Sequence, residues 1–395
     1  MTERLYYDNS YLTQFEAECV ETQSEDERIL IRLNRTAFYP TSGGQRHDTG
    51  YLNNVPVVDV FERKGEVWHV VDRPITCGPV VGRIDWARRF DFMQQHTGFH
   101  LLAGAFRRVL QVDTLSSHLG EEIATIDVSL NTISEETVRK VEEQANQVIA
   151  ENRLVRAFWV GADELEALEL RKQPAAREKI RLVEIRDFDL DPCGGTHVRQ
   201  TAEVQLVKIL RWEKLRGNLR LYFLAGGRAV RSYTRLWQLV RRLNRELTAG
   251  ENELLERVRD LKDEIKSQKK RLQALKDFWV EQQTERLKRE AYERKRDFVV
   301  FRFENEDFAD VKTVAQKLTR EAKLLTALFS EGEKNWRLIL AAPEKSKINL
   351  RTWLEDLRTV SPVKGGGRPT WVEVIGDRNL DQVAQLIDIK MKSKE

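Results

Sequence analysis

A long helical stretch with a coiled-coil rhythm constrains this chain more than any other feature of its sequence. From about Arg231 to Arg296, apolar residues recur at a spacing near 3.5 residues, and Lys, Arg and Glu are dense between them. The apolar positions are Leu236, Val240, Leu243, Leu247, Val258, Leu261, Ile265, Leu272, Leu275 and Trp279, with Gln268 at one place in the seam. Gly250 interrupts the rhythm. The pattern predicts a coiled coil or a helical hairpin over 231–297.

The chain around this stretch is long enough for further domains, since 395 residues exceed what one compact core accommodates. Residues 1–85 contain runs rich in β-branched and aromatic residues, such as Val55–Phe61 and Val67–Val71. Glycine-rich turn signals separate these runs, among them Cys77-Gly-Pro79. Short strands joined by such turns predict a small N-terminal β-barrel domain.

Residues 86–230 mix helical and strand patterns. Helical spacing of apolar residues covers Phe90–Leu110, and a second helix is expected to start near Ser134. Strand signals lie at Ile123–Val128, Val155–Val160, Ile180–Ile185, Val204–Leu210 and Leu219–Leu224. This mixture predicts an α+β domain.

Residues 298–395 again alternate between strands and helices, which predicts a small α/β domain. Strands are expected at Phe298–Phe303, Trp336–Ala341 and Trp371–Ile375, and helices at Phe308–Ala322 and Ile348–Leu357. A glycine run, Gly365–Arg368, lies between the second helix and the third strand. The whole chain is therefore expected to be of the α+β class.

Net charge and cysteine content limit which partners and which cellular compartment are expected for the protein. The net charge is only +3, so contacts with nucleic acid would have to come from local basic patches. The three cysteines, Cys19, Cys77 and Cys193, argue against a disulfide framework and for a reducing cytoplasm, with Cys19 and Cys77 as ordinary reduced thiols. No apolar run approaches the roughly 20 residues of a membrane span, and the N-terminus lacks the apolar segment of a signal peptide. We therefore expect a cytoplasmic protein with no membrane partner.

Two short motifs carry candidate metal ligands. His96 and His100 are four residues apart on the predicted helix, so both rings can face one ion. Cys193 and His197 enclose Gly-Gly-Thr in a predicted loop, where glycines permit a tight turn. Each motif alone is ambiguous, but together they hold three of the six histidines in a donor set suited to zinc. Thr97 stands where a metalloprotease helix carries glutamate, which argues against a zinc protease.

The segments around these ligands resemble the alanyl-tRNA editing proteins of the AlaX type and the editing domain of alanyl-tRNA synthetase. The matching segments are Gln95–Leu102, Ser117–Glu122, Asp191–Val198, Lys214–Arg228, and Phe38–Gln45 with Asp48 and Gly50. The helical stretch and Gly365–Arg368 resemble the coiled coil and the DHHA-type C-terminal domain of that family, so the resemblance covers nearly the whole chain. It implies a free-standing, ATP-independent editing hydrolase of the long AlaX type. Its substrate would be tRNA(Ala) wrongly charged with serine, with glycine as a second candidate.

The resemblance also suggests functional residues. It places Ser116 and Ser117 near the substrate pocket, where their hydroxyls could recognise serine or position a water molecule. A plain serine-rich turn is equally open. His118 could act beside them, or could be a structural histidine. The residues that would present amide groups to the substrate end are Gly43, Gly44 and Gln45, although the glycines equally fit a barrel turn.

The sequence leaves the role of the zinc ion open. It could activate a water molecule, polarise the ester carbonyl or hold the 3′ end of the tRNA. Four protein ligands are otherwise typical of a structural ion. The expected partner is tRNA, contacted at its acceptor end and, through the C-terminal domain, at its elbow. Homodimerisation through the coiled coil and the C-terminal domain is a further expectation.

Basic residues lie beside several of these features and are candidates for phosphate contacts. They are Arg83, Arg88, Arg89, Lys208, Arg211, Lys214, Arg216, Arg220, Lys364 and Arg368. Two other functions stay open on the sequence. One is an editing hydrolase for another mischarged tRNA, such as seryl-tRNA(Thr). The other is a catalytically inert, zinc-structured protein that binds tRNA.

Overall fold

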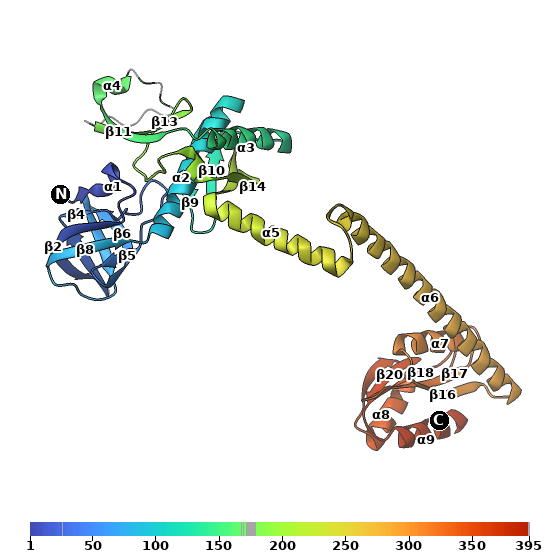
Figure 1. The fold of residues 1–395 in the computed structure, drawn as a ribbon. Helices are drawn as coiled ribbons and strands as arrows, with labels where there is room; N and C mark the ends of the chain where they lie inside the picture. The colour runs from blue at the N-terminus through green and yellow to red at the C-terminus, as the bar shows by residue number, and fades with distance from the viewer. Residues whose placement is uncertain (26, 167, 169, 171–178, 394–395) are drawn as a thin grey trace. The chain divides into compact units, whose positions relative to one another are not determined.

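The computed structural model describes residues 1–393 apart from 26, 167, 169 and 171–178 (Figure 1). It contains two compact units, Met1–Leu243 and Asn244–Glu395. Helices and several sheets occur together, which confirms the mixed α+β class. Among the helices of the described residues, none combines the length and apolar character needed to cross a membrane.

Six strands near the N-terminus form a closed barrel in the order β2-β3-β7-β6-β5-β8. Their bounds are β2 Gln14–Glu25, β3 Arg28–Leu33, β5 Gly50–Leu52, β6 Val55–Arg63, β7 Glu66–Val71 and β8 Gly78–Ile84. β2 pairs antiparallel with both β3 and β8. Its inward residues Phe15, Ala17 and Cys19 alternate with exposed glutamates, because successive side chains of a strand point to opposite faces. Short elements beside the barrel are β1 Glu3–Arg4, α1 Leu5–Asp8 and β4 Arg35–Thr36.

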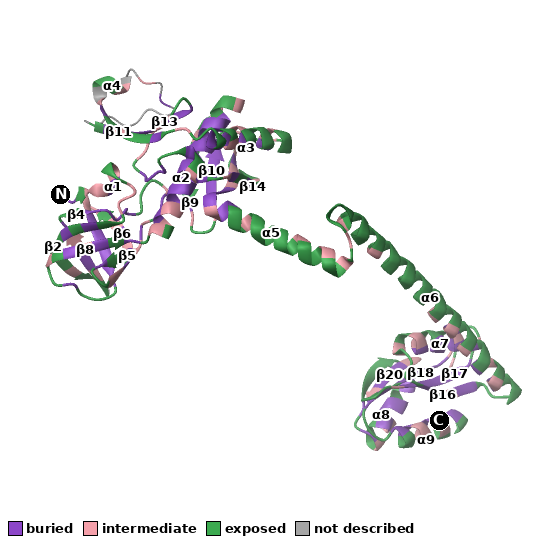
Figure 2. Ribbon diagram, viewed as in Figure 1, coloured by how far each residue is buried: buried purple, intermediate pink, exposed green. Residues whose placement is uncertain are grey.

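The second part of this unit is built around helix α2, Trp86–Leu110. Asp85 caps its start, since the carboxylate accepts a hydrogen bond from the backbone N–H of Arg88. The helix is buried along most of its length, as Figure 2 shows. It packs with α3, Glu135–Ala150, against an antiparallel sheet of order β14-β15-β10-β9. These strands are β9 Thr114–Leu119, β10 Ala124–Val128, β14 Val207–Leu215 and β15 Asn218–Ala225.

A three-stranded antiparallel sheet, β11-β12-β13, completes the unit. Its elements are β11 Val155–Gly161, α4 Ala162–Glu166, β12 Lys179–Ile185 and β13 Asp189–Pro192, followed by a short helix, Thr201–Val204. Strand β13 ends directly before Cys193. This sheet therefore delivers one of the candidate ligands to its place beside α2.

A buried ion pair ties the barrel to α2. Arg89 and Asp48 are both almost completely buried, and Nε of Arg89 donates to Oδ1 of Asp48 over 2.9 Å. The remaining guanidinium groups donate to the carbonyl oxygens of Ser10 and Ala37, at 2.7 and 2.6 Å. Arg89 was expected among the candidate phosphate contacts. That expectation is wrong, because the side chain is fully buried and all three of its nitrogens are bonded to residues within the protein.

The second unit is a five-stranded sheet covered by helices on both faces. The strand order is β16-β17-β18-β20-β19, with β16 and β17 parallel and the other pairs antiparallel. Helices α6 and α7 cover one face, and α8 and α9 cover the other (Figure 1). The bounds are α6 Leu254–Glu293, β16 Phe298–Glu304, α7 Phe308–Arg320, β17 Leu325–Glu331, β18 Trp336–Ala341, α8 Leu350–Val360, β19 Lys364–Arg368, β20 Trp371–Gly376 and α9 Leu380–Ser393.

Several local expectations need correction. The long helical stretch is two helices, α5 (Gly226–Leu247) and α6, which break around the expected Gly250. Whether they form a coiled coil or a hairpin stays a prediction. The alternative of a serine-rich turn at 116–117 is wrong, because both serines lie in β9. The glycine run 365–367 is part of edge strand β19 rather than a connection between elements, since its backbone pairs with β20.

Candidate metal centre

The four predicted ligands come together in the structure. One donor atom from each of His96, His100, Cys193 and His197 lies within 4.8 Å of the others. Sγ of Cys193 is 3.3 Å from Nε2 of His96 and 3.2 Å from Nε2 of His197. Ligands that share one zinc ion at bond lengths of about 2.0–2.3 Å are themselves roughly 3–4 Å apart. The donor set therefore fits a single metal ion.

Two of the histidine rings have polar partners at Nδ1, the ring nitrogen that faces away from the point shared by the four donor atoms. Nδ1 of His100 donates to Oδ2 of Asp189 over 2.8 Å, and both groups are buried. Nδ1 of His197 lies 3.2 Å from Oγ1 of Thr97, which also accepts a hydrogen bond from the backbone of Val198. Such partners fix which nitrogen carries the proton and leave Nε2 available for a metal.

The third ring is held by Gln45. Oε1 of Gln45 accepts from Nδ1 of His96 at 2.8 Å, and also from the backbone N–H of Thr196 at 3.1 Å. Its Nε2 donates to Oγ1 of Thr196 at 2.8 Å. Because this side chain is only 1% exposed, the structure makes it a positioning group between the two ligand motifs. Its predicted contact with substrate remains untested.

The loop that carries Cys193 is fixed by close contacts. Nη1 of Arg181 donates to the carbonyl oxygens of Cys193 and Gly195, at 2.8 and 3.0 Å. A Cβ atom at position 195 would lie 2.1 Å from Cε1 of His96, so any residue other than glycine would push that ring away. The three ligand histidines are buried, whereas Cys193 is half-buried and Gly194 is exposed. The cluster therefore approaches the surface at Cys193 and Gly194.

Burial and mutual charge set the protonation of the ligands. Burial lowers the pKa of His197 to about 3. Burial also acts to lower the pKa of His100, but hydrogen bonds to Asp189 and Cys193 outweigh it and raise this pKa to about 9. For Cys193, burial opposes ionisation, yet the charges of His96 and His197 hold the pKa well below its ordinary value. The cluster thus favours the thiolate, which is the form that binds a metal.

The three residues predicted around the substrate pocket lie on strand β9, but their side chains do not all point to the same face of it. Ser117 is half-buried and lies against the turn that precedes Gln45, where Oγ of Ser117 is 3.5 Å from the Cβ position of Gly44. Ser116 and His118 are exposed and alternate with it on the strand, so they face the other side. Oγ of Ser116 donates to Asp127 over 2.6 Å. His118 lines a separate cavity of about 600 Å³. The structure therefore does not bring the three residues together.

Backbone conformation explains why the turn before Gln45 contains two glycines. Gly43 and Gly44 have φ values of +56° and +84°, in the left-handed region that glycine adopts without strain. Ser42 and Gln45 exchange two backbone hydrogen bonds across this two-residue turn, at 3.0 and 2.9 Å. The backbone of Gly44 also accepts a hydrogen bond from the N–H of Leu119 in β9. The turn thus links the barrel, strand β9 and, through Gln45, the metal ligands.

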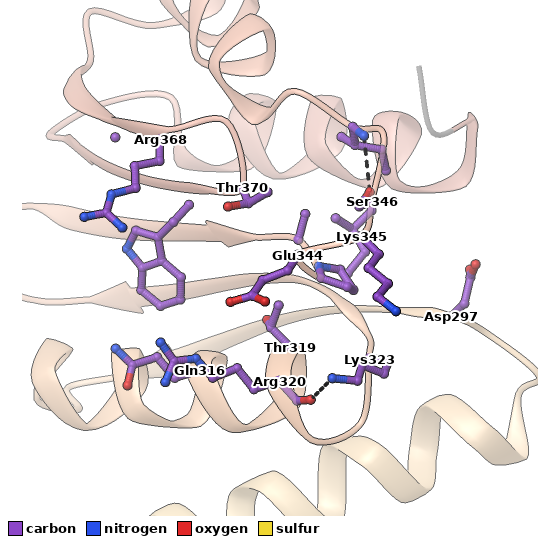
Figure 3. Close-up of a pocket in the computed structure, with 16 residues that line it drawn as sticks. Asp297, Gln316, Thr319, Arg320, Lys323, Glu344, Lys345, Ser346, Arg368 and Thr370 are labelled. Carbon is purple, nitrogen blue, oxygen red and sulfur yellow. Dashed lines mark hydrogen bonds between the residues drawn. The ribbon is translucent and has the colours of Figure 1, made fainter.

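Some of the basic residues that were candidates for phosphate contacts form ion pairs with acidic residues of the protein itself. Arg88 forms an ion pair with Glu121 at 2.7 Å, and Arg220 one with Asp127 at 2.7 Å. In the second unit, basic side chains line a cavity of about 1370 Å³ (Figure 3). They are Arg320, Lys323, Lys345 and Arg368, with Trp371 among the other lining residues.

The sequence predicts the four residues that the structure brings together, but it does not predict the groups that orient them. Asp189 had no motif around it, although it lies on the strand that leads into the cysteine loop. Thr97 has no metal-ligand type of side chain, so the sequence does not mark it as a partner of His197. Arg181 lies on β12 and had no signal of its own. Only the fold brings these side chains to the cluster.

An α+β domain that gathers three imidazoles and a thiol beside a barrel defines a class of protein with a cluster of side chains able to hold a metal ion. The family described as "Threonyl and Alanyl tRNA synthetase second additional domain" matches residues 180–222, which include Cys193 and His197. The alanyl-tRNA editing protein AlaX-L of Pyrococcus horikoshii is 30% identical over 381 residues, which are 93% of each chain. The chain belongs to this family of alanyl-tRNA editing proteins.

Other similar proteins are larger or matched only in part. The alanine–tRNA ligase of Ignicoccus hospitalis is 37% identical over 283 residues, covering 68% of this chain and 31% of the ligase. This chain thus spans less than a third of that relative. Among solved structures, the C-Ala domain of alanyl-tRNA synthetase from Aquifex aeolicus matches 23% of this chain and 86% of that domain. The identity is 16% and the TM-score 0.21, too low for a comparison of folds.

Proposed function

We propose that this protein hydrolyses the ester bond of tRNA(Ala) mischarged with serine, with glycyl-tRNA(Ala) as a second substrate. The observation that carries the proposal is the convergence of His96, His100, Cys193 and His197 within 4.8 Å. Membership of the alanyl-tRNA editing family supports the choice of substrate class.

Zinc is the proposed metal, held by these four residues, because one thiolate and three imidazoles match its ligand preferences. When bound, it would supply Lewis acidity toward an ester carbonyl or a water molecule. The contribution of the chain is orientation. Gln45, Asp189 and Thr97 hold the three rings, and burial keeps solvent from the ligand nitrogens. The substrate would approach at Gly194, where the cluster lies nearest the surface.

Serine would be selected by a polar contact that alanine cannot make. A site built to hydrogen-bond a hydroxyl disfavours the analogue without it, because its own polar groups are then left unpaired. Ser117 is the better candidate for this contact, since it lies beside Gly44 and the turn that carries Gln45. Ser116 is the weaker candidate, because its hydroxyl is already bonded to Asp127.

We also propose that the second unit binds tRNA, with the elbow as the expected contact, and contributes to a homodimer. The four basic residues of its cavity could contact phosphates, and Trp371 offers an aromatic surface to a base. Reversing charge at Lys345 and Arg368 should weaken tRNA binding and reduce its salt dependence. Unchanged binding, measured by filter retention at several salt concentrations, would reject this contact.

The deciding experiment compares deacylation of seryl-tRNA(Ala), glycyl-tRNA(Ala), alanyl-tRNA(Ala) and seryl-tRNA(Thr), with and without a chelator. Preference for seryl-tRNA(Ala), lost on chelation and restored by zinc, is the expected result. Faster attack on seryl-tRNA(Thr) would favour the alternative tRNA specificity. Zinc and tRNA binding without hydrolysis of any substrate would favour an inert, zinc-structured protein.

A further inference from the structure

Two cysteines outside the metal centre meet at the seam of the barrel. Cys19 lies on β2, and Cys77 directly precedes β8, 58 residues later. Their sulfur atoms are 3.2 Å apart, and β2 and β8 pair so that Cys19 is opposite Gly78. Oγ1 of Thr22 lies 3.7 Å from the first sulfur and 3.5 Å from the second. The sequence predicted two ordinary thiols, but the barrel makes them a pair.

The two thiols differ in a way that suits stepwise oxidation. Cys77 is exposed to solvent, whereas Cys19 is buried. Hydrogen bonds from Thr22 and from the Cys19 thiol lower the pKa of Cys77, while burial raises the pKa of Cys19. An exposed thiol with a lowered pKa is the group that an oxidant reaches first. A neighbouring thiol can then resolve the oxidised sulfur.

We propose that Cys19 and Cys77 are a reversible dithiol–disulfide site that a peroxide oxidises. The Cys77 thiolate attacks one peroxide oxygen, the O–O bond breaks, and the second oxygen leaves as water after taking up a proton. Cys77 is then a sulfenic acid. The sulfur of Cys19 attacks the sulfur of Cys77, the S–O bond breaks, and the hydroxide leaves as water with the proton of Cys19. In total, two thiols are oxidised and one peroxide is reduced to two water molecules.

The expected consequence is stability rather than control of the metal centre. The disulfide would join β2 to β8 across the 58-residue separation and so restrict the unfolded chain. The pair is at the Gly78 end of β8, whereas α2 follows the Ile84 end. At about 3.3 Å per residue, the length of β8 puts roughly 20 Å between the pair and the start of that helix. Oxidation should therefore leave the metal ligands undisturbed.

The experiment treats the full, zinc-loaded chain with hydrogen peroxide at one equivalent and maps its peptides by mass spectrometry. We expect one Cys19–Cys77 linked peptide, loss of two hydrogen atoms in mass, and full reversal by a dithiol reductant. The Tm should rise on the order of 5–10 °C on oxidation, with unchanged zinc content. Three thiols that stay free, or a bond that includes Cys193, would overturn the proposal.

Two variants separate the steps. Cys77→Ser changes an exposed residue and should abolish both the linked peptide and the rise in Tm. Cys19→Ser should leave Cys77 as a sulfenic acid that a cyclic 1,3-diketone traps. A rise in Tm that persists in Cys77→Ser would show that the stabilisation comes from elsewhere, and the assignment would then be wrong. An untrappable, unmodified Cys77 in Cys19→Ser would equally reject the proposed order of steps.

Discussion

The barrel and the candidate metal centre both contain buried histidines, but the ring nitrogens of these histidines have different surroundings. In the barrel, His69 donates from Nδ1 to the carbonyl oxygen of Ile31 at 3.1 Å, and its Nε2 lies 2.8 Å from the hydroxyl of Thr36. In the metal centre, the Nδ1 atoms of His96 and His197 have polar partners, while their Nε2 atoms face the sulfur of Cys193.

The difference teaches what separates a structural histidine from a ligand. His69 has both ring nitrogens satisfied by uncharged oxygen atoms, so burial keeps it neutral and lowers its pKa to about 4. The histidines of the candidate metal centre have one ring nitrogen satisfied and the other directed at a shared point. Burial is common to both, and so it does not distinguish them. The direction of the second nitrogen does.

The largest expected effect is loss of the metal from the cluster. His100→Ala or Cys193→Ala should reduce zinc from one per chain to none, because each removes a ligand from a four-ligand set. His96→Ala should abolish hydrolysis of every substrate, measured by release of radiolabelled amino acid. His69→Gln is the matched control and should retain the zinc. Full zinc content in both ligand variants, measured by mass spectrometry, would disprove the site.

The next effect is a dependence of stability on pH in the barrel. The pKa of His69 is about 4 in the folded protein and about 6.5 when unfolded, so the unfolded chain binds the extra proton between these values. Stability should therefore fall by about 3 kcal/mol as the pH drops from 6.5 to 4. Urea unfolding of the wild type and of His69→Gln at each pH gives the difference. Parallel curves for the two proteins would contradict the assignment.

A smaller effect is expected at the groups that orient the rings. Asp189→Asn should weaken zinc binding by about 10- to 100-fold, because the hydrogen bond to His100 loses its charge. Thr36→Val, which removes the hydroxyl beside Nε2 of His69, should lower stability and leave zinc affinity unchanged. Competition with a chromogenic chelator measures both. Equal zinc affinities for wild type and Asp189→Asn would show that this contact does not support the metal.

The smallest effect concerns substrate choice. Ser117→Ala should reduce the preference for seryl- over alanyl-tRNA(Ala) by a several-fold to tenfold factor, about 1 kcal/mol for one hydrogen bond. Ser116→Ala is the matched control, since its hydroxyl is engaged by Asp127 on the other side of β9. Ratios of kcat/KM for the two substrates decide it. A larger change in Ser116→Ala than in Ser117→Ala would reverse the assignment.

The sequence predicts the four residues of the candidate metal centre because each motif is local. His96 and His100 share one helical turn, and Cys193 and His197 share one glycine loop, so spacing alone placed each pair. The orienting groups could not be predicted in this way. Gln45 is 51 residues from His96, and Asp189 is 89 residues from His100, so only the packed fold brings each pair together.

The same distinction holds for the secondary structure. Strands β6 and β7 and helix α2 have strong local patterns and lie where expected, within a few residues. Strand β9 carries Ser116, Ser117 and His118, which give no strand signal, and it forms because β10 pairs with it. Strand β19 is mostly glycine and depends in the same way on β20. Both strands owe their conformation to their neighbours.

The buried pair of Arg89 and Asp48 bears on how this protein could be divided or recombined. Arg89 belongs to helix α2, which carries His96 and His100, but its acceptors on Asp48, Ser10 and Ala37 all belong to the first 85 residues. Separating the two segments would remove all of these hydrogen-bond partners from Arg89 and would leave the Asp48 carboxylate without its counter-ion. The barrel and the domain that contains α2 are therefore coupled through this buried ion pair. A gene fusion that moved the metal ligands to another protein would have to carry the barrel with them.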